Sequence, residues 1–210
     1  MSEKTDCWRK CFYDSLRYVY ENKFRNGSDK NILTEADLVC HVWQELNNCN
    51  KIKFNFKTYL EVTWYKPDDK INYADLTILD PAQLNVEFVD DIAYLQNKGF
   101  FYNEDAIAAE FKYIRHDSNL NDLATKDLLK MKDLIEKINS NQTDQTQPPP
   151  MNIDKFHGII VIGCKNNVFF ERTLNFFTDR FSELSQEIKS KIDYYIFSPE
   201  RFETLYLVEQ

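Results

Sequence analysis

The stretch Ala106-Ile-Ala-Ala-Glu-Phe-Lys-Tyr-Ile114 sets one acid and one amine inside an otherwise apolar run. Side chains alternate across a β-strand, so we expect Glu110 and Lys112 to share a face with Ala108 and Ile114. The opposite face would carry Ala109, Phe111 and Tyr113. Burying a charge is costly unless the charge is paired or binds a metal. The two charges therefore either form a buried ion pair or act together.

A second strand-like run upstream has the same character. Tyr73-Ala-Asp-Leu-Thr-Ile-Leu79 alternates as a strand does and contains Asp75. An Asp on one strand and Glu-x-Lys on the next predict a small acidic site with one amine beside it.

Composition sets broad limits on the class of protein. The chain has 210 residues, 43% of them hydrophobic and 15% aromatic, which is enough for one core, so we expect a single domain over residues 1–210. No apolar stretch approaches the roughly 20 residues of a membrane helix, and the N-terminus does not resemble a secretory signal. We therefore expect a cytoplasmic protein with no membrane partner. The net charge of -8 argues against a general nucleic-acid coat but leaves room for a local basic groove.

The five cysteines do not predict a disulfide framework or a zinc site. Their number is odd and no CxxC pair occurs, so we interpret them as reduced thiols. Their positions are Cys7, Cys11, Cys40, Cys49 and Cys164.

The chain alternates between helix-like and strand-like segments. Apolar residues at helical spacing predict helices over residues 6–23, 35–46, 120–138 and 168–188, and Thr34 is expected to cap the second. Aromatic and β-branched runs predict strands over residues 54–65, 71–79, 105–115, 156–164 and 194–197. Residues 82–103 fit either a short helix or an excursion of the sheet. The polar, proline-containing segment 139–152 is expected to be a mobile linker.

The order helix, strand, strand, strand, helix, strand predicts an α/β fold. This order and the pattern Asp75, then Glu110-Phe111-Lys112, resemble the PD-(D/E)xK, or restriction-endonuclease-like, nuclease superfamily. The resemblance covers about residues 31–164. It implies an αβββαβ core, in which a central mixed sheet is flanked by helices, with extra helices toward both ends of the chain.

The resemblance also implies the site residues. Asp75, Glu110, Lys112 and Glu35 would be catalytic, with Glu35 coming from the first core helix. Asp75, Glu110 and the backbone carbonyl of Phe111 would hold Mg²⁺, for which Mn²⁺ substitutes. Carboxylate-bound magnesium suits phosphodiester cleavage, because it stabilises phosphate charge and activates water. Lys112 would orient that water or stabilise the developing charge. Three lysines of the helix at residues 120–138 are candidates for phosphate contacts: Lys126, Lys130 and Lys132.

Each assignment has a structural alternative. Glu-x-Lys also occurs in solvated sheets, with Phe111 facing the core instead. Asp75 also suits a strand edge or a turn, and Glu35 also suits the first turn of a helix, where it complements the dipole. The helix lysines also fit a solvated face.

The sequence therefore predicts a metal-dependent nuclease that hydrolyses phosphodiester bonds, with DNA as the expected partner. The alternative is a non-catalytic nuclease-fold protein that binds or assembles with a protein partner. Whether DNA or RNA is bound, and whether the chain forms a homodimer, stays open at this point.

Overall fold

One six-stranded sheet organises the structure, a computed structural model that describes residues 1–25, 32–49, 54–65, 72–80, 105–116, 120–139 and 153–205. The strands follow the chain order across the sheet: β1 (Lys57–Tyr65), β2 (Asn72–Leu79), β3 (Ala106–Ile114), β4 (Phe156–Cys164), β5 (Ile192–Phe197) and β6 (Phe202–Leu205). Strands β3, β4 and β5 run parallel, while β1, β2 and β6 pair antiparallel with their neighbours. The sheet is therefore mixed, as expected.

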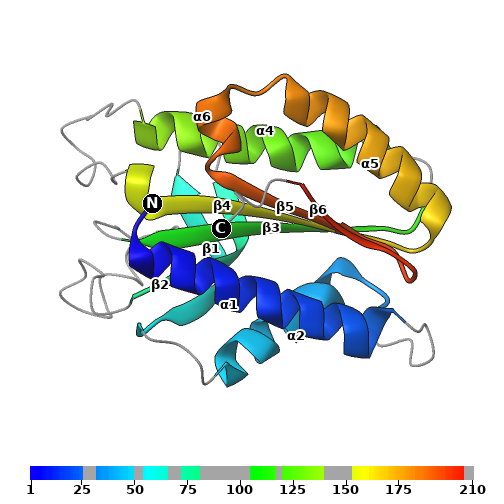
Figure 1. Cartoon of the computed structure of the whole chain (residues 1–210), viewed down its shortest axis with the longest axis horizontal. Coiled ribbons are helices and arrows are strands. Elements are labelled where there is room, and N and C mark those ends of the chain that lie inside the picture. Colours follow the sequence, from blue (N-terminus) through cyan, green and yellow to red (C-terminus); the bar gives the residue numbers. More distant parts are fainter. Residues whose placement is uncertain are drawn as a thin grey trace.

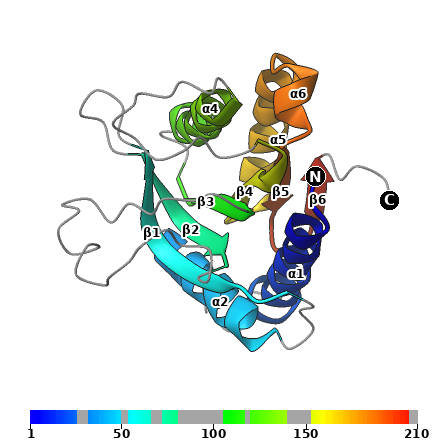
Figure 2. The same cartoon turned by 90° about the vertical axis from the view of Figure 1, so that its left-hand side faces the viewer.

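Helices cover both faces of this sheet (Figures 1 and 2). One face carries α1 (Glu3–Val19), which continues into the π-helical turn η1 (Tyr20–Phe24), and α2 (Glu35–Asn48). The other carries α4 (Leu120–Asn139), α5 (Asn167–Ser182) and α6 (Gln186–Lys189), and a short turn, η4 (Ile153–Lys155), precedes β4. Each parallel connection contains helix, which is how parallel strands are joined.

The central strands divide their side chains between the two layers of helices. Ala108 and Ile114 of β3 belong to the core under α4, whereas Ala109 and Phe111 belong to the core over α1 and α2. This confirms the alternation predicted for β3. All nine residues of β4 are buried, as predicted for a strand covered on both faces.

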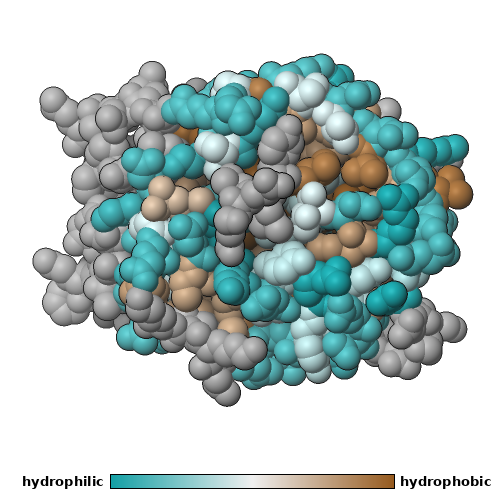
Figure 3. Space-filling view, in the orientation of Figure 1, coloured by the Kyte–Doolittle hydropathy of each residue, from teal (hydrophilic) through white to brown (hydrophobic). Residues whose placement is uncertain are grey.

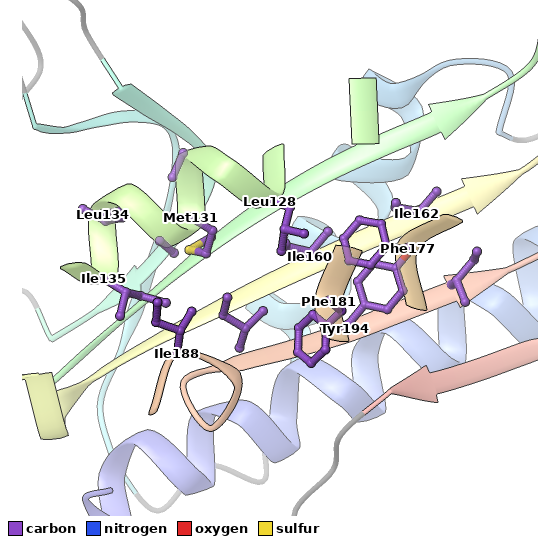
Figure 4. Packing of buried hydrophobic residues seen from close by; sticks show 14 of the residues in the cluster. Leu128, Met131, Leu134, Ile135, Ile160, Ile162, Phe177, Phe181, Ile188 and Tyr194 are labelled. Atoms are coloured by element: carbon purple, nitrogen blue, oxygen red, sulfur yellow. The ribbon is translucent and has the colours of Figure 1, made fainter. Parts of the chain in front are cut away.

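The core under α4 and α5 is built from large aliphatic and aromatic side chains (Figure 4). The rings of Phe177 and Tyr194 stack with centroids 3.9 Å apart, and Met131 packs against the backbone at Gly158. A Cβ atom at Gly158 would lie 2.5 Å from the Met131 sulfur, so this glycine lets α4 approach β4 closely. The position of α4 over the middle of the sheet is thereby fixed.

Helix α2 begins where the sequence predicts. The Thr34 hydroxyl accepts the N–H of Asp37, and the Asp37 carboxylate accepts the N–H of Thr34, which together form a capping box. The cap fixes the first turn of α2 and therefore the position of Glu35.

Two expectations about the C-terminal third are wrong. The single helix predicted over residues 168–188 is two helices, because Ser185 accepts the N–H of Ile188 and starts α6 afresh. The strand predicted over residues 194–197, which is β5, was expected to be the last one. Instead β6 follows it, after a turn closed by hydrogen bonds between Ser198 and Arg201, and pairs with β5.

Some expectations fall outside the described residues. These are the assignments for residues 82–103 and for the linker at residues 140–152; residue 139 ends α4. The helices that are described include none with the length and apolar character needed to cross a membrane. Hydrophilic side chains cover most of the face shown in Figure 3.

Candidate active site

The site begins where β2 separates from β3. The ladder between them runs from Leu79 opposite Ala106 to Leu76 opposite Ala109. Beyond that pair, within the described parts of these strands, the β3 backbone meets acids instead. Asp75 Oδ2 accepts the N–H of Phe111 at 2.7 Å.

A second acid continues this pattern along the same edge of β3. Glu35 Oε2, from the first turn of α2, accepts the N–H of Tyr113 at 3.4 Å. Buried backbone donors need partners, so the two carboxylates replace the carbonyls that β2 no longer supplies. In consequence Asp75 and Glu35, which are far apart in sequence, line one edge of β3.

A backbone distortion in β1 accompanies this separation. Glu61 has φ = 51°, in the left-handed region that non-glycine residues rarely adopt. Its neighbours Leu60 and Val62 pair with Leu76 and Ala74, so Glu61 lies across from Asp75. The distortion therefore occurs at the level of the sheet where β2 leaves β3.

Strand β3 and helix α4 face each other through four charged side chains. Lys130 Nζ lies 2.7 Å from Glu110 Oε1, and Lys112 Nζ lies 3.6 Å from Asp127 Oδ2. The pairing is crossed: the helix amine meets the strand acid, and the helix acid meets the strand amine. Lys112 Nζ also lies 3.1 Å from Glu35 Oε2, so it connects α4 to the start of α2.

These charges are withdrawn from solvent to different degrees. The side chain of Glu110 is 5% exposed, and those of Lys112 and Asp127 are 17% and 15% exposed. Lys130 is 27% exposed and reaches Glu110 from the more open side. The cluster thus has a buried floor at Glu110 and an open rim.

The charge balance of the cluster is negative. Its four acids are Glu35, Asp75, Glu110 and Asp127, and its two amines are Lys112 and Lys130. With every group ionised, the described cluster carries a surplus of two negative charges. One divalent cation would neutralise this surplus, and the donors are all hard oxygens of the kind that Mg²⁺ prefers.

Burial and mutual repulsion raise the carboxyl pKa values. Burial, followed by the charge of Asp75, raises the pKa of Glu110 to about 8. Burial also raises the pKa of Asp127 to about 6, against the opposing effect of Lys112. The pKa of Asp75 is raised by burial, and its hydrogen bond from Phe111 offsets part of that effect. The site therefore disfavours its own full negative charge, because buried carboxyl groups that lie close together favour their neutral forms.

The surroundings of Lys112 favour its charged form, in contrast to those of the acids. Burial lowers its pKa, but the carboxylates of Asp127 and Glu35 outweigh burial and leave the pKa raised. Lys112 is therefore a fixed positive charge, held between two helices by acids on both sides.

All four residues predicted as catalytic come together here. Asp75, Glu35, Glu110 and Lys112 lie around one short segment of β3, and the Phe111 ring points to the opposite face while its backbone borders Asp75. In the parts of the chain that are described, no three side chains of His, Cys, Asp or Glu converge tightly enough to form a metal cage in advance.

Sequence reasoning missed one member of the cluster. Asp127 lies four residues before Met131 and seven before Leu134, so it occupies the inner stripe of α4; an acid at such a position was the available signal. Of the three lysines predicted to contact phosphate, Lys130 belongs to this cluster, and for Lys126 and Lys132 the contact stays a prediction. Lys126 is exposed, and Lys132 pairs with Glu136 along the helix at 3.5 Å.

A second charged network lies under α1. The Arg9 guanidinium makes two hydrogen bonds to Asp193, at 2.7 and 2.6 Å, and His157 Nε2 lies 3.1 Å from the same carboxylate. His157 and Asp193 are buried, so substrates do not reach them. We interpret this network as a structural anchor for α1.

The fold and the site together define a mixed α/β protein with a partly buried carboxylate and lysine centre on its third strand. Comparison of the chain with protein-family models, with curated proteins and with solved structures found no match.

Proposed function

We propose that this protein is a metal-dependent nuclease of the PD-(D/E)xK type that hydrolyses phosphodiester bonds, with DNA as the expected substrate. The observation that carries the proposal is the convergence of Asp75, Glu110, Lys112 and Glu35 on one segment of β3. The order α2, β1, β2, β3, α4, β4 among the described elements supports a restriction-endonuclease-like core. Fold alone does not define substrate, so the proposal depends on the site.

The donor set fits a magnesium ion. Asp75, Glu110 and the Phe111 carbonyl would hold it, because the carbonyl of a strand residue leaves on the same edge as its N–H. When bound, such an ion stabilises charge on the phosphate and makes a nucleophile available near neutral pH.

The chain's own residues supply orientation and charge. Lys112 is held by Asp127 and Glu35, and its ammonium would orient the attacking water and stabilise charge that develops in the transition state. Glu35 also fixes the N–H of Tyr113 and so keeps β3 in register with α2. The buried floor at Glu110 keeps bulk water away from the reacting groups.

Cleavage assays test this proposal directly. The purified protein, with Mg²⁺ or Mn²⁺, is incubated with single-stranded, double-stranded and branched DNA. We expect Lys112→Ala to slow cleavage about a hundredfold or more, because it removes the ammonium that Asp127 and Glu35 hold beside the proposed metal ligands. Lys132→Ala is the matched control, since Lys132 pairs only along α4 among the interactions described. Equal rates for wild type and Lys112→Ala would show that the catalytic assignment is wrong.

One observation favours the alternative of a non-catalytic binding or assembly protein. Glu110 and Lys112 already have partners on α4. A purely structural role, in which this crossed network fixes α4 on the sheet, would account for these contacts. A protein of this kind would take up no Mn²⁺, and Asp75→Asn would leave the heat of a Mn²⁺ titration unchanged. Metal uptake that depends on Asp75 therefore separates the two functions.

A further inference from the structure

Lys130 occupies the carboxylate that the metal would need. Its ammonium lies 2.7 Å from Glu110 Oε1, and Glu110 is the most buried acid of the cluster. The ammonium occupies one acceptor site of the carboxylate and sets a positive charge beside any cation that Glu110 would bind. A divalent ion bound by Glu110 therefore competes with Lys130.

The competition leaves the ammonium in need of another anion. A divalent ion and an ammonium on the same buried carboxylate repel each other, and the repulsion is strong where water is partly excluded. Lys130 has a long, flexible side chain and is more exposed than its partner Glu110, so its ammonium can turn toward the open rim. A substrate phosphate arriving at that rim is the natural new partner.

We propose that Lys130 is a substrate-binding residue that exchanges partners: its ammonium neutralises Glu110 in the free protein and moves to a phosphate of the nucleic acid when a divalent ion takes Glu110. This inference rests on the nuclease function proposed above and adds a specific order to it. Metal and substrate help each other bind, because the metal frees Lys130 to contact the phosphate, and the phosphate draws Lys130 away from the carboxylate that the metal uses. Such coupling between two ligands is reciprocal by thermodynamic necessity.

The crossed pairing explains why Lys130, and not Lys112, is the mobile cation. Lys112 is held by Asp127 and Glu35 together, so it keeps an acid partner even if one contact is lost. Among the described residues, Glu110 is the ion-pair partner of Lys130, whereas Asp75 and Asp127 attract its ammonium without forming an ion pair, so losing the Glu110 contact leaves Lys130 without a direct acid partner. The two lysines therefore have different tasks, one fixed at the reacting centre and one exchanged on binding.

The test uses Lys130→Met in the full chain, with Lys132→Met as the control from the same helix. Mn²⁺ affinity is measured by electron paramagnetic resonance without nucleic acid, and the kinetics of cleavage of a DNA duplex are measured separately. We expect Lys130→Met to bind Mn²⁺ about tenfold tighter, because a nearby positive charge is gone. We also expect a higher KM for DNA with a smaller change in kcat. Lys132→Met should match wild type in both assays.

Lys130→Arg supplies the second variant. It keeps the charge, so we expect a Mn²⁺ affinity close to that of wild type and partial retention of DNA binding. Circular dichroism confirms that each variant is folded.

The outcomes separate this inference from the proposed function. Wild type that binds Mn²⁺ and cleaves DNA, together with a Lys130→Met variant whose Mn²⁺ affinity is unchanged or weaker, would overturn the exchange while leaving the nuclease function standing. An unchanged KM would likewise overturn the phosphate contact. Wild type that neither binds Mn²⁺ nor cleaves DNA would overturn the nuclease function and this inference with it.

Discussion

The carboxylate of Asp75 has two possible tasks, and they differ in what they require of it. Accepting the Phe111 N–H at 2.7 Å needs only an acceptor oxygen, whereas holding a divalent cation needs a negative charge. The hydrogen bond is a structural task that Asp75 performs, and metal binding is the task that we propose. A substitution that keeps the acceptor and removes the charge separates the two tasks.

Asp75→Asn and Asp75→Leu provide this separation. We expect Asp75→Asn to keep the free energy of unfolding within about 0.5 kcal/mol of wild type, since its amide oxygen still accepts the N–H, while Asp75→Leu loses about 1–3 kcal/mol. Both variants should lose Mn²⁺ binding. Urea unfolding and Mn²⁺ titration measure the two effects, and an Asp75→Asn variant that still binds Mn²⁺ as wild type does would contradict the assignment of Asp75 as a ligand.

Strain at Glu61 leads to a further prediction at this scale. A non-glycine residue in the left-handed region carries a cost of about 1 kcal/mol that glycine avoids. We expect Glu61→Gly to raise the free energy of unfolding by up to about 1 kcal/mol in urea. Leu60→Gly, at the neighbouring position of β1, should lower it instead. A Glu61→Gly variant that is less stable than Leu60→Gly would show that Glu61 is not strained.

At the scale of elements, prediction succeeded where one local signal decided the outcome. The start of α2 follows from Thr34, and the two faces of β3 follow from strict alternation. It failed where tertiary contacts decide. Apolar spacing continues through residues 183–185, yet Ser185 starts a new helix, and β6 exists because β5 offers it an edge. The position of Asp127 in the inner stripe of α4 is a local signal, but its partner Lys112 follows only from the packing of α4 across β3.

The anchor under α1 holds this helix on the sheet, and a substitution in the anchor tests that role. Arg9→Met would leave Asp193 buried without its bidentate partner, so we expect a loss of about 3 kcal/mol or more in the free energy of unfolding. Arg17→Met is the control on the same helix, because Arg17 pairs with Glu21 at the surface and should cost less than about 1 kcal/mol. Similar losses in the free energy of unfolding for both variants would contradict the anchor role.

The same anchor predicts how stability depends on acid pH. Burial raises the pKa of Asp193, but His157 and Arg9 outweigh burial and lower it to about 2, below the unfolded value of about 3.9. A carboxyl with a lowered pKa stabilises the fold above its unfolded pKa and loses that contribution as pH falls through its folded pKa. We therefore expect stability to fall between about pH 4 and pH 2.

Asp193→Asn supplies the comparison for this acid dependence. The variant should be less stable at neutral pH and should show a flatter dependence of stability on pH in that interval. Chemical unfolding at a series of pH values measures both. A dependence as steep as that of wild type would show that other carboxyls are responsible.

At the scale of the whole molecule, the sheet and its two helical layers bring distant charges to one place. Segments at residues 35, 75, 110 and 127 meet because β2 pairs with β3, while α2 and α4 contact β3 from opposite faces of the sheet (Figure 2). The net charge of -8 makes a general nucleic-acid surface unfavourable, so contact with DNA is expected to depend on a few amines at the site and on the bound cation. With every group ionised, the surplus of two negative charges in the cluster predicts one divalent cation per chain.

Calorimetric titration of Mn²⁺ into the wild-type protein and into Glu110→Gln tests this account most directly. We predict that wild type binds one ion per chain, that Glu110→Gln binds none, and that Glu203→Gln, a change of the same kind on β6, binds as wild type does. Absence of binding to wild type, or equal binding to wild type and Glu110→Gln, would contradict the claim that these acids and their lysines form a metal-dependent hydrolytic centre.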